Sequence, residues 1–190
     1  MQMIFFEYNV KMLIGFTGLK GSGKDTAALY FVDKGWKRLA FADPLKEVCR
    51  HLFNFNERQL HGDLKDVIDP IWNISPRQVF TYIGTELVRE QLGSFLNVGD
   101  IFWCLNMSQR LSLIDGDVVI TDVRFENEAS LIRSLGGWII RVVRPGLEQS
   151  DHISEQGNFK VDETVINDST IESLHKKIAT LKWTGRTLNE

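Results

Sequence analysis

The chain has 190 residues, of which 43% are hydrophobic and 25% charged, the length and composition of one globular domain. A net charge of −3 without a long basic run argues against non-specific binding to duplex nucleic acid. No apolar run approaches the roughly 18 residues that span a bilayer, and the start MQMIFFEYNVK lacks the basic region of a signal peptide, so we expect neither a nucleic-acid nor a membrane partner and a cytoplasmic location.

Short apolar runs alternate with helical patterns along the chain, which predicts a parallel sheet with crossover helices. We expect one domain over residues 12–181, preceded by an edge strand or N-terminal extension at 1–11 and followed by a frayed tail at 182–190. The polar stretch 54–74 interrupts the alternation, and we interpret it as an excursion on the substrate side. The expected strands cover residues 13–17, 38–41, 118–121, 138–143 and 164–166. The expected helices cover residues 25–32, 75–92, 100–113, 127–135 and 170–181, with one more that begins at residue 43.

The first expected strand runs directly into a glycine-rich loop, GLKGSGKDT at residues 18–26. Between a buried strand and a helix, Gly18, Gly21 and Gly23 let the backbone curl so that several N–H groups face one anion, and the helix adds its positive N-terminal end. Lys24 follows as a point cation for phosphate. The spacing predicts a phosphate-binding loop, and a glycine-rich turn with an exposed lysine is the alternative. The candidate phosphate-binding residues are Lys20, Gly21, Ser22, Gly23, Lys24, Asp25 and Thr26.

The last position of this loop departs from the commonest phosphate-binding pattern. Asp25 follows Lys24 where that pattern has Ser or Thr, and the hydroxyl comes one residue later, on Thr26. The pattern Gly-x-x-Gly-x-Gly-Lys-x-Thr resembles GxxGxGKGT, the loop of nucleoside monophosphate kinases. In those enzymes the displaced Thr lies close to the α-phosphate, and water and nucleotide oxygens help to hold the metal. The resemblance implies that role for Thr26.

The second expected strand ends in FADPLK, where Asp43 and Pro44 open a helix as its cap and its first-turn proline. Ligands of doubly wound sheets gather at the carboxyl ends of the strands. Lys46, in the first turn of this helix, is therefore a candidate for an acceptor phosphate, and a solvated lysine is the alternative.

The helix expected at residues 75–92 has three faces at 100° per residue. Val79, Phe80, Ile83 and Leu87 form the predicted core face, and Gln78, Tyr82, Glu86 and Arg89 the predicted solvent face. A third stripe carries one cation, two hydroxyls and a glycine, and it is a candidate acceptor wall: Arg77, Thr81, Gly84, Thr85 and Val88. Gly84 costs about 1 kcal/mol in a helix interior, which indicates a close approach by either a ligand or another helix.

The helix expected at residues 100–113 contains Trp103, whose indole suits either a nucleobase stack or core packing. Cys49 and Cys104 lie far apart and outside CxxC spacing, so we interpret both as buried free thiols in a reducing compartment. Together with four scattered histidines they supply too few ligands for a zinc site.

The apolar strand expected at residues 118–121 ends in Asp122, which is well placed to orient a hydrated Mg²⁺ or to bind substrate. Arg124 has the fork geometry that phosphate recognition favours. Glu128 lies one helical turn further on, within reach of the Arg124 guanidinium. The alternative is a helix-capping Asp followed by an Arg that pairs with surface acids.

The charged loop expected at residues 144–160 begins with Arg144 and holds His152 and Lys160. In phosphoryl-transfer enzymes such a loop often closes and brings arginine to the transferring group. We therefore expect a lid, with Arg144 as a catalytic cation, and we interpret His152 as a surface residue because phosphate acceptors are already ionised and need no base.

Taken together, these stretches resemble the bacteriophage deoxynucleoside monophosphate kinases, a branch of the P-loop kinases. The stretches are GLKGSGKDT, LAFADPLK, IGTELV, TDVRFENEA, VVRPG with DHISE, and INDSTIESL. The resemblance covers residues 12 to about 181. It implies a three-layer sandwich with a five-stranded parallel sheet of order 2-3-1-4-5 and helices on both faces. It also implies transfer of the γ-phosphoryl of ATP to a deoxynucleoside 5′-monophosphate with Mg²⁺, and a homodimer.

The resemblance extends to individual positions. Leu45, Lys46, Arg77, Gly84, Thr85 and Trp103 would wall the acceptor. Asp122, Arg124 and Glu128 would form a polar cluster between acceptor and ATP, with Asp122 reaching the metal through water. Lys24, Arg124 and Arg144 would stabilise the transferring phosphoryl. The stretch between Lys46 and Ser75 is shorter than in other members, which leaves base selectivity open.

Two other functions suit the same residues. One is a different small-molecule P-loop kinase, acting on dephospho-coenzyme A or phosphomevalonate, since INDSTIESL resembles the end of dephospho-coenzyme A kinases. The other is a nucleotide-binding switch or ATPase module without an acceptor. The stripe of Arg77, Thr81, Gly84 and Thr85 argues against the second, because a pure switch needs no second pocket.

Overall fold

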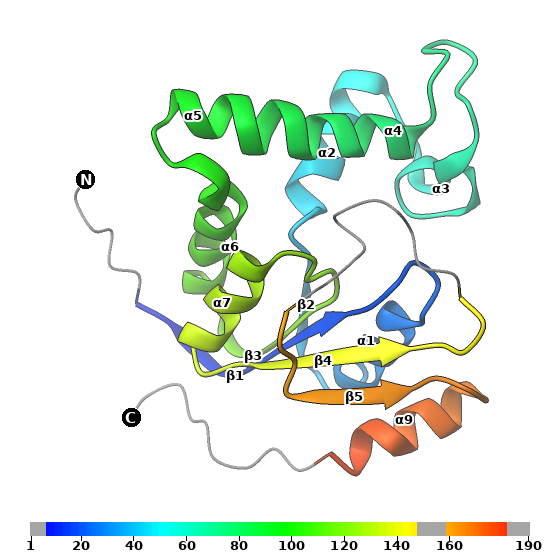
Figure 1. Cartoon of the computed structure of the whole chain (residues 1–190), viewed down its shortest axis with the longest axis vertical. Helices are drawn as coiled ribbons and strands as arrows, with labels where there is room; N and C mark the ends of the chain where they lie inside the picture. Colours follow the sequence, from blue (N-terminus) through cyan, green and yellow to red (C-terminus); the bar gives the residue numbers. More distant parts are fainter. Residues whose placement is uncertain (1–6, 148–158, 182–190) are drawn as a thin grey trace. The chain divides into compact units, whose positions relative to one another are not determined.

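A computed structural model describes residues 7–147 and 159–181 of the chain (Figure 1). The first half of the described chain contains β1 (Asn9–Thr17), α1 (Lys24–Val32), β2 (Lys37–Leu39), α2 (Asp43–Phe53), α3 (Glu57–Leu60), the 3-10 helix η1 (Asp63–Asp66), α4 (Pro76–Thr81) and the π-helix η2 (Tyr82–Leu92). The second half contains α5 (Gly93–Phe95), the 3-10 helix η3 (Gly99–Ile101), α6 (Phe102–Ser112), β3 (Asp115–Ile120), α7 (Glu126–Ser134), β4 (Trp138–Val143), β5 (Glu163–Ile166) and α9 (Ile171–Ala179).

The five strands form one parallel sheet in the order β2-β3-β1-β4-β5, which confirms the predicted order. The central strand β1 pairs with β3 on one side and β4 on the other, so Ile14 lies opposite both Val119 and Trp138. Buried parallel strands carry apolar residues on both faces, and the last five residues of β1 are all buried. β1 begins at Asn9, so three residues of the predicted N-terminal extension belong to the central strand.

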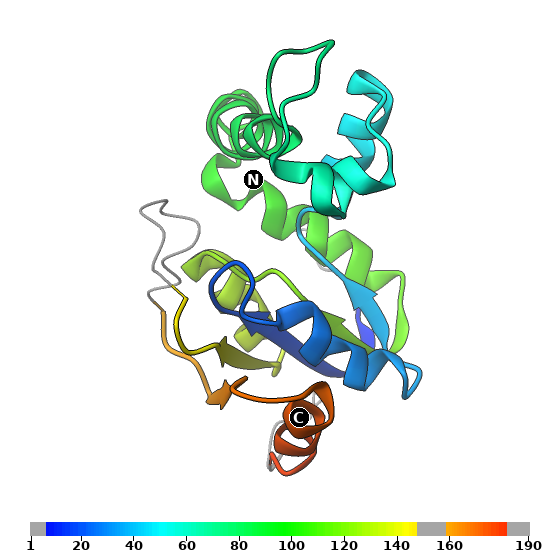
Figure 2. The same cartoon turned by 90° about the vertical axis from the view of Figure 1, so that its right-hand side faces the viewer.

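Each face of the sheet is covered by helices, because side chains alternate along a strand. Ile14 and Phe16 face the core that contains Phe31 of α1 and Ile178 of α9. Gly15 faces the opposite way, where a Cβ on it would lie 2.7 Å from Ile132 Cδ1 of α7. α1 and α9 therefore cover one face and α7 the other, which is the predicted three-layer arrangement (Figures 1 and 2).

The chain divides into two compact units. Unit 1 consists of Met1–Ala40 and Asn106–Glu190 and, where it is described, holds the whole sheet with α1, α7 and α9. Unit 2 consists of Phe41–Leu105 and is helical. The predicted excursion at residues 54–74 is thus part of a larger inserted unit.

The excursion has more structure than its polar sequence suggests. Asn56 and Gln59 form a capping box at α3, and Asp69 and Ile74 form an isolated β-bridge. Phe55, only 2% exposed, stacks on Phe53 of α2 with ring centroids 5.2 Å apart. The Trp72 Nε1 donates to Phe53 O at 3.0 Å. Aromatic packing therefore holds this stretch on α2.

The helix predicted at residues 75–92 begins as expected, with Ser75 accepting a hydrogen bond from Gln78 N in a capping box and Pro76 in the first turn. It does not stay α-helical, because residues Tyr82–Leu92 form π-helix η2 with i→i+5 hydrogen bonds. The predicted helix 100–113 is likewise divided, into η3 and α6. Among the described residues, none of the helices is both long enough and apolar enough to cross a membrane.

Candidate functional site

The loop between β1 and α1 has the curled backbone that the sequence predicts. Gly18, Gly21 and Gly23 have φ angles of 139°, 77° and 99°, in a region that side chains other than glycine rarely adopt. At Gly18 space also excludes a side chain, because a Cβ would lie 2.3 Å from Val142 O of β4. α1 starts immediately after Gly23, with Ala27 N donating to Gly23 O at 2.8 Å. The N-terminal amides and positive dipole end of α1 therefore belong to this loop.

Lys24 returns to the loop from the first turn of α1. Its Nζ donates to Gly18 O and Leu19 O, at 2.7 Å in both cases. These contacts hold an ammonium group against the start of the loop, where it can neutralise a phosphate. The Lys24 ammonium group is thus held beside Gly18 and Leu19 of the loop.

Ser22 gives a further sign that this loop binds a polar ligand. Its residue is only 1% exposed, and among the described residues its buried Oγ has no hydrogen-bond partner. Buried hydroxyls are almost always paired, and an unpaired one in a native structure calls for an explanation. An oxyanion bound in the loop would supply the missing acceptor.

Two residues far along the chain support the loop from outside. Asn167, which directly follows β5, donates through Nδ2 to Ser22 O at 2.9 Å. The His175 Nε2 of α9 lies 2.8 Å from Thr26 O, in the first turn of α1. Sequence reasoning did not find either residue. INDSTIESL resembled the end of a known family, but nothing in that stretch by itself indicates a contact with residue 22.

The residues that follow β3 lie beside the start of the phosphate loop. Val123 N donates to Phe16 O at 3.0 Å, which ties this segment to the penultimate residue of β1. Asp122 is half-buried, and Arg124 is exposed. The structure thus brings Asp122 and Arg124 to the same end of the sheet as the loop, as predicted for parallel strands.

Glu128 binds the backbone at the start of α7. It is 3% exposed, and its Oε2 accepts hydrogen bonds from the backbone N–H groups of Arg124 and Phe125, at 2.8 and 3.2 Å. A carboxylate in this place satisfies the free amides at the start of α7 and complements the helix dipole. Glu128 therefore fixes the backbone that carries Arg124.

Arg144 follows β4 and is exposed. Most of the predicted lid, including His152, lies outside the described residues. Lys160 is described, and its carbonyl oxygen accepts a hydrogen bond from Arg133 of α7.

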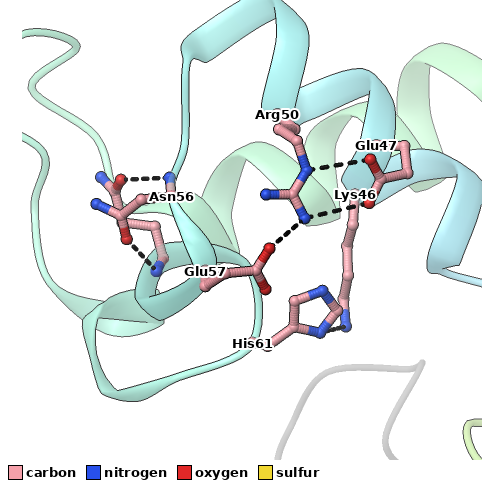
Figure 3. Close-up of polar contacts among 7 residues, drawn as sticks. Lys46, Glu47, Arg50, Asn56, Glu57 and His61 are labelled. Atoms are coloured by element: carbon pink, nitrogen blue, oxygen red, sulfur yellow. Dashed lines mark hydrogen bonds and ion pairs between the residues drawn. The ribbon is translucent and has the colours of Figure 1, made fainter.

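In unit 2, the predicted acceptor lysine lies next to a histidine. The Lys46 Nζ is 3.3 Å from His61 Nδ1 (Figure 3). One helical turn further along α2, Arg50 donates through Nε to Glu47 Oε2 at 3.0 Å and reaches Glu57 Oε1 at 2.7 Å. The hydrogen bond from Arg50 lowers the pKa of Glu47. Arg50 thus links α2 to α3, while Lys46 and His61 place two basic groups together.

The residues of the third stripe of the predicted helix share the same degree of burial. All five of its residues are half-buried: Arg77, Thr81, Gly84, Thr85 and Val88. Arg77 pairs with Asp66 of η1 through Nε and Nη2. A guanidinium held by a carboxylate is oriented, and an incoming phosphate can replace that carboxylate.

Gly84 is explained by helix packing. A Cβ on it would lie 3.0 Å from Leu45 Cδ2 of α2, and its carbonyl accepts a hydrogen bond from Trp103 Nε1 at 2.9 Å. Trp103 is only 8% exposed. Of the alternatives left open by the sequence, packing accounts for both residues, and the indole N–H of Trp103 is used by the backbone.

The exposure predicted for two residues of this helix is wrong. Arg89, assigned to solvent, is 9% exposed and donates through Nη1 to Asp100 O at 3.0 Å, whereas Leu87, assigned to the core, is 41% exposed. The physical reason is the π-helix, whose wider turn shifts the buried face relative to the 100° spacing of an α-helix.

Comparison with known proteins decides the family. The family model described as deoxynucleotide monophosphate kinase matches residues 57–178. A protein of Acanthamoeba polyphaga mimivirus, named only provisionally as a deoxynucleotide monophosphate kinase, is 37% identical over 183 residues, covering 88% of this chain and 94% of its own length. The chain belongs to the deoxynucleotide monophosphate kinase family.

Other relatives match this chain over shorter stretches. The deoxynucleoside-5′-monophosphate kinase of Escherichia phage T5 is 34% identical over 113 residues, which is 54% of this chain and 42% of the phage protein. Among solved structures, TT1252 from Thermus thermophilus has a TM-score of 0.50 at 18% identity, covering 92% of this chain and 98% of its own. This second likeness concerns the fold alone.

The carboxylates near the phosphate loop suit an Mg²⁺ ion that is bound together with a nucleotide. Among residues 7–147 and 159–181, no three His, Cys, Asp or Glu side chains group into a metal site. Mg²⁺ typically takes one or two protein carboxylates and completes its shell with water and phosphate oxygens. Asp122 and Asp25, both at the phosphate-loop end of the sheet, supply carboxylates of that kind. The two cysteines are free and buried, as predicted.

Proposed function

We propose that this member of the family transfers the γ-phosphoryl of ATP to a deoxynucleoside 5′-monophosphate, giving the diphosphate and ADP for DNA synthesis. The observation that carries the proposal is the loop of Gly18, Gly21 and Gly23, with Lys24 folded back onto it. A curled backbone, a helix N-terminus and an ammonium group together bind polyphosphate. The family supplies the acceptor class.

Unit 1 binds ATP in this proposal. The backbone N–H groups of the loop and the Lys24 ammonium hold the phosphates, the Ser22 hydroxyl donates to one of their oxygens, and Thr26 lies near the α-phosphate. When bound, Mg²⁺ neutralises charge that develops on the phosphoryl oxygens. Asp122 would hold it through water. The full set of ATP-phosphate residues is Lys20, Gly21, Ser22, Gly23, Lys24, Asp25 and Thr26.

Unit 2 binds the acceptor. Lys46 and Arg77 supply the cations that an acceptor phosphate needs, and Thr81 and Thr85 supply hydroxyls on the same half-buried stripe. Leu45 and Trp103 both pack against Gly84 of this stripe. Val88 extends the stripe as an apolar contact.

Catalysis in this proposal is positioning plus charge neutralisation, because phosphoryl transfer asks the protein for little covalent chemistry. Lys24, Arg124 and Arg144 stabilise the transferring phosphoryl. Glu128 holds the backbone of Arg124, so the arginine begins from a fixed point. The homodimer and the host-cytoplasm location implied by the resemblance remain predictions.

The test is an ADP-release assay with ATP and Mg²⁺ across all deoxy- and ribonucleoside monophosphates, with dephospho-coenzyme A and phosphomevalonate as further acceptors. We expect turnover that depends on a deoxynucleoside monophosphate. Lys24→Ala should lower kcat by about 100-fold or more, the usual cost of removing one electrostatic donor from an active site.

The matched control is Lys34→Ala, which removes a lysine near the other end of α1, where Nζ lies 4.7 Å from the centre of the Tyr30 ring. Its kcat should stay within twofold of wild type. ATP hydrolysis at one rate with and without every monophosphate would reject the proposal, and so would a Lys24→Ala variant as active as the control.

A further inference from the structure

The residue that directly follows β5, Asn167, contacts the phosphate loop at Ser22 and Gly23. Asn167 Nδ2 donates to Ser22 O at 2.9 Å, across 145 positions of sequence. The same nitrogen lies where a side chain on Gly23 would project, 2.4 Å from the position of a Cβ. Asn167 is therefore both a donor to the loop and in close contact with it.

The geometry of the peptide bond makes this contact directional. In a planar trans peptide the C=O of one residue and the N–H of the next point in opposite directions. Because Asn167 holds Ser22 C=O outward, toward itself, the Gly23 N–H must point the opposite way. Gly23 can take this orientation at little cost because its φ of 99° suits glycine.

Asn167 is itself firmly placed. Its backbone N donates to Val143 O at the end of β4, at 2.7 Å. The preceding residue, Ile166, has its carbonyl bound by Lys177 Nζ at 2.9 Å, and the same nitrogen lies 2.6 Å from Asp168 Oδ1. A donor anchored to two strands and a helix can impose an orientation on a flexible glycine loop.

We propose that Asn167 is a positioning residue for ATP: its amide fixes the Ser22–Gly23 peptide so that the Gly23 N–H faces the polyphosphate. The inference deepens the proposed function and rests on it for the identity of the nucleotide. Its distinctive consequence is that losing Asn167 weakens the binding of ATP and leaves the binding of the acceptor unchanged.

Two substitutions separate hydrogen bonding from packing. Asn167→Asp keeps the shape but replaces the donor with a carboxylate that repels both Ser22 O and the polyphosphate. Asn167→Ala removes the group and leaves Gly23 more space. A net hydrogen bond corresponds to a roughly 10-fold effect, so we expect about 10-fold weaker ATP binding for Asn167→Ala and about 100-fold for Asn167→Asp, where charge repulsion adds to the loss. Asn167→Ser replaces either variant if it fails to fold.

The matched control is Lys176→Met, which removes the exposed lysine next to Lys177 on α9 and leaves the bonds of Asn167 and Ile166 in place. The readouts are the Kd of a non-hydrolysable ATP analogue, KM for ATP and for the acceptor, and hydrogen exchange of the amides at residues 18–24. We expect both Asn167 variants to raise the Kd and the KM for ATP and to speed exchange at Gly23, with the acceptor KM within twofold. The control should match wild type in ATP affinity.

Equal losses of ATP affinity in Asn167→Ala and Lys176→Met, or an equal rise in the acceptor KM, would overturn the inference and leave Asn167 a packing residue. Because nucleotide affinity and hydrogen exchange are measured without turnover, the inference stands or falls separately from the proposed function, which fails if the wild-type protein shows no monophosphate-dependent ADP release.

Discussion

Cys49 shows how burial of a single side chain ties stability to pH. It lies on α2 with 0% exposure, and desolvation by burial raises the pKa of its thiol from 9.0 to about 11. The unfolded chain therefore ionises this thiol before the folded chain does. The stability that the neutral thiol contributes is fully present below pH 9 and is lost as pH rises toward 11. At pH 10 the loss amounts to about 1 kcal/mol in the free energy of unfolding.

Denaturant unfolding of wild type and Cys49→Ala at pH 8 and pH 10, under reducing conditions, measures this effect. Other titrating groups are shared by the two proteins, so their contributions cancel in the comparison. Wild type should lose about 1 kcal/mol more than the variant between the two pH values. Parallel losses in the two proteins would show that the Cys49 thiol ionises equally well when folded.

Among residues with a site role, those that could be predicted from sequence belong to contiguous motifs. The conformation of GLKGSGKDT could be predicted from the motif alone, because three glycines at that spacing indicate a curled backbone and the lysine indicates a cation beside it. Asn167 could not be found in this way, since its contact with Ser22 depends on the sheet order placing β5 two strands away from β1. Glu128 was found from its spacing, but its bonds to the backbone N–H groups of Arg124 and Phe125 were not, because the sequence shows the separation of two residues and not which donors one of them faces.

At the scale of elements, prediction worked where local chemistry decides and failed where packing decides. The strands followed from apolar runs, their order followed from the family resemblance, and the start of α4 followed from Ser75 and Pro76. The switch to a π-helix at Tyr82 has no such local signal. It accompanies contacts from other helices, among them the bond from Trp103 to Gly84 O and the bond from Arg89 to Asp100 O. The misplaced Arg89 and Leu87 both come from that switch.

The packing of η2 on α2 gives a test of Gly84. Gly84→Ala gains about 1 kcal/mol of helix propensity and loses a similar amount because Leu45 Cδ2, 3.0 Å from the new Cβ, must move. We expect the free energy of unfolding to stay within about 1 kcal/mol of wild type and the acceptor KM within about threefold. Urea unfolding and initial-rate kinetics measure both.

The bulkier Gly84→Leu is the matched comparison, since its side chain cannot fit against Leu45 and should destabilise the protein by about 1–3 kcal/mol through overpacking. A Gly84→Ala variant that is fully stable but has a tenfold higher acceptor KM would instead identify Gly84 as part of the ligand wall.

At the scale of the whole molecule, the residues proposed for the two substrates fall in different units. The phosphate loop with Asn167 and Asp122 belongs to unit 1, and Lys46 with the Arg77 stripe belongs to unit 2. The sequence indicated this division only through its short polar stretch at 54–74. The inserted unit is larger because α2 and the helices from α4 onward pack with that stretch.

Substitution of Arg77 tests whether unit 2 alone binds the acceptor. Arg77→Met removes a charged hydrogen-bond donor, an interaction worth about 1.5–3 kcal/mol, so the acceptor KM should rise at least about 10-fold while KM for ATP stays within twofold. Lys20→Met in unit 1 should show the reverse, and the double variant should combine the two effects multiplicatively, as expected for independent sites. Steady-state kinetics with each substrate varied in turn measures all three variants.

Asp66→Asn is the control, because it removes the charge that pairs with Arg77 but keeps the guanidinium, and its acceptor KM should stay within about threefold of wild type. If Arg77→Met raised both KM values alike, the assignment of one substrate to each unit would be wrong.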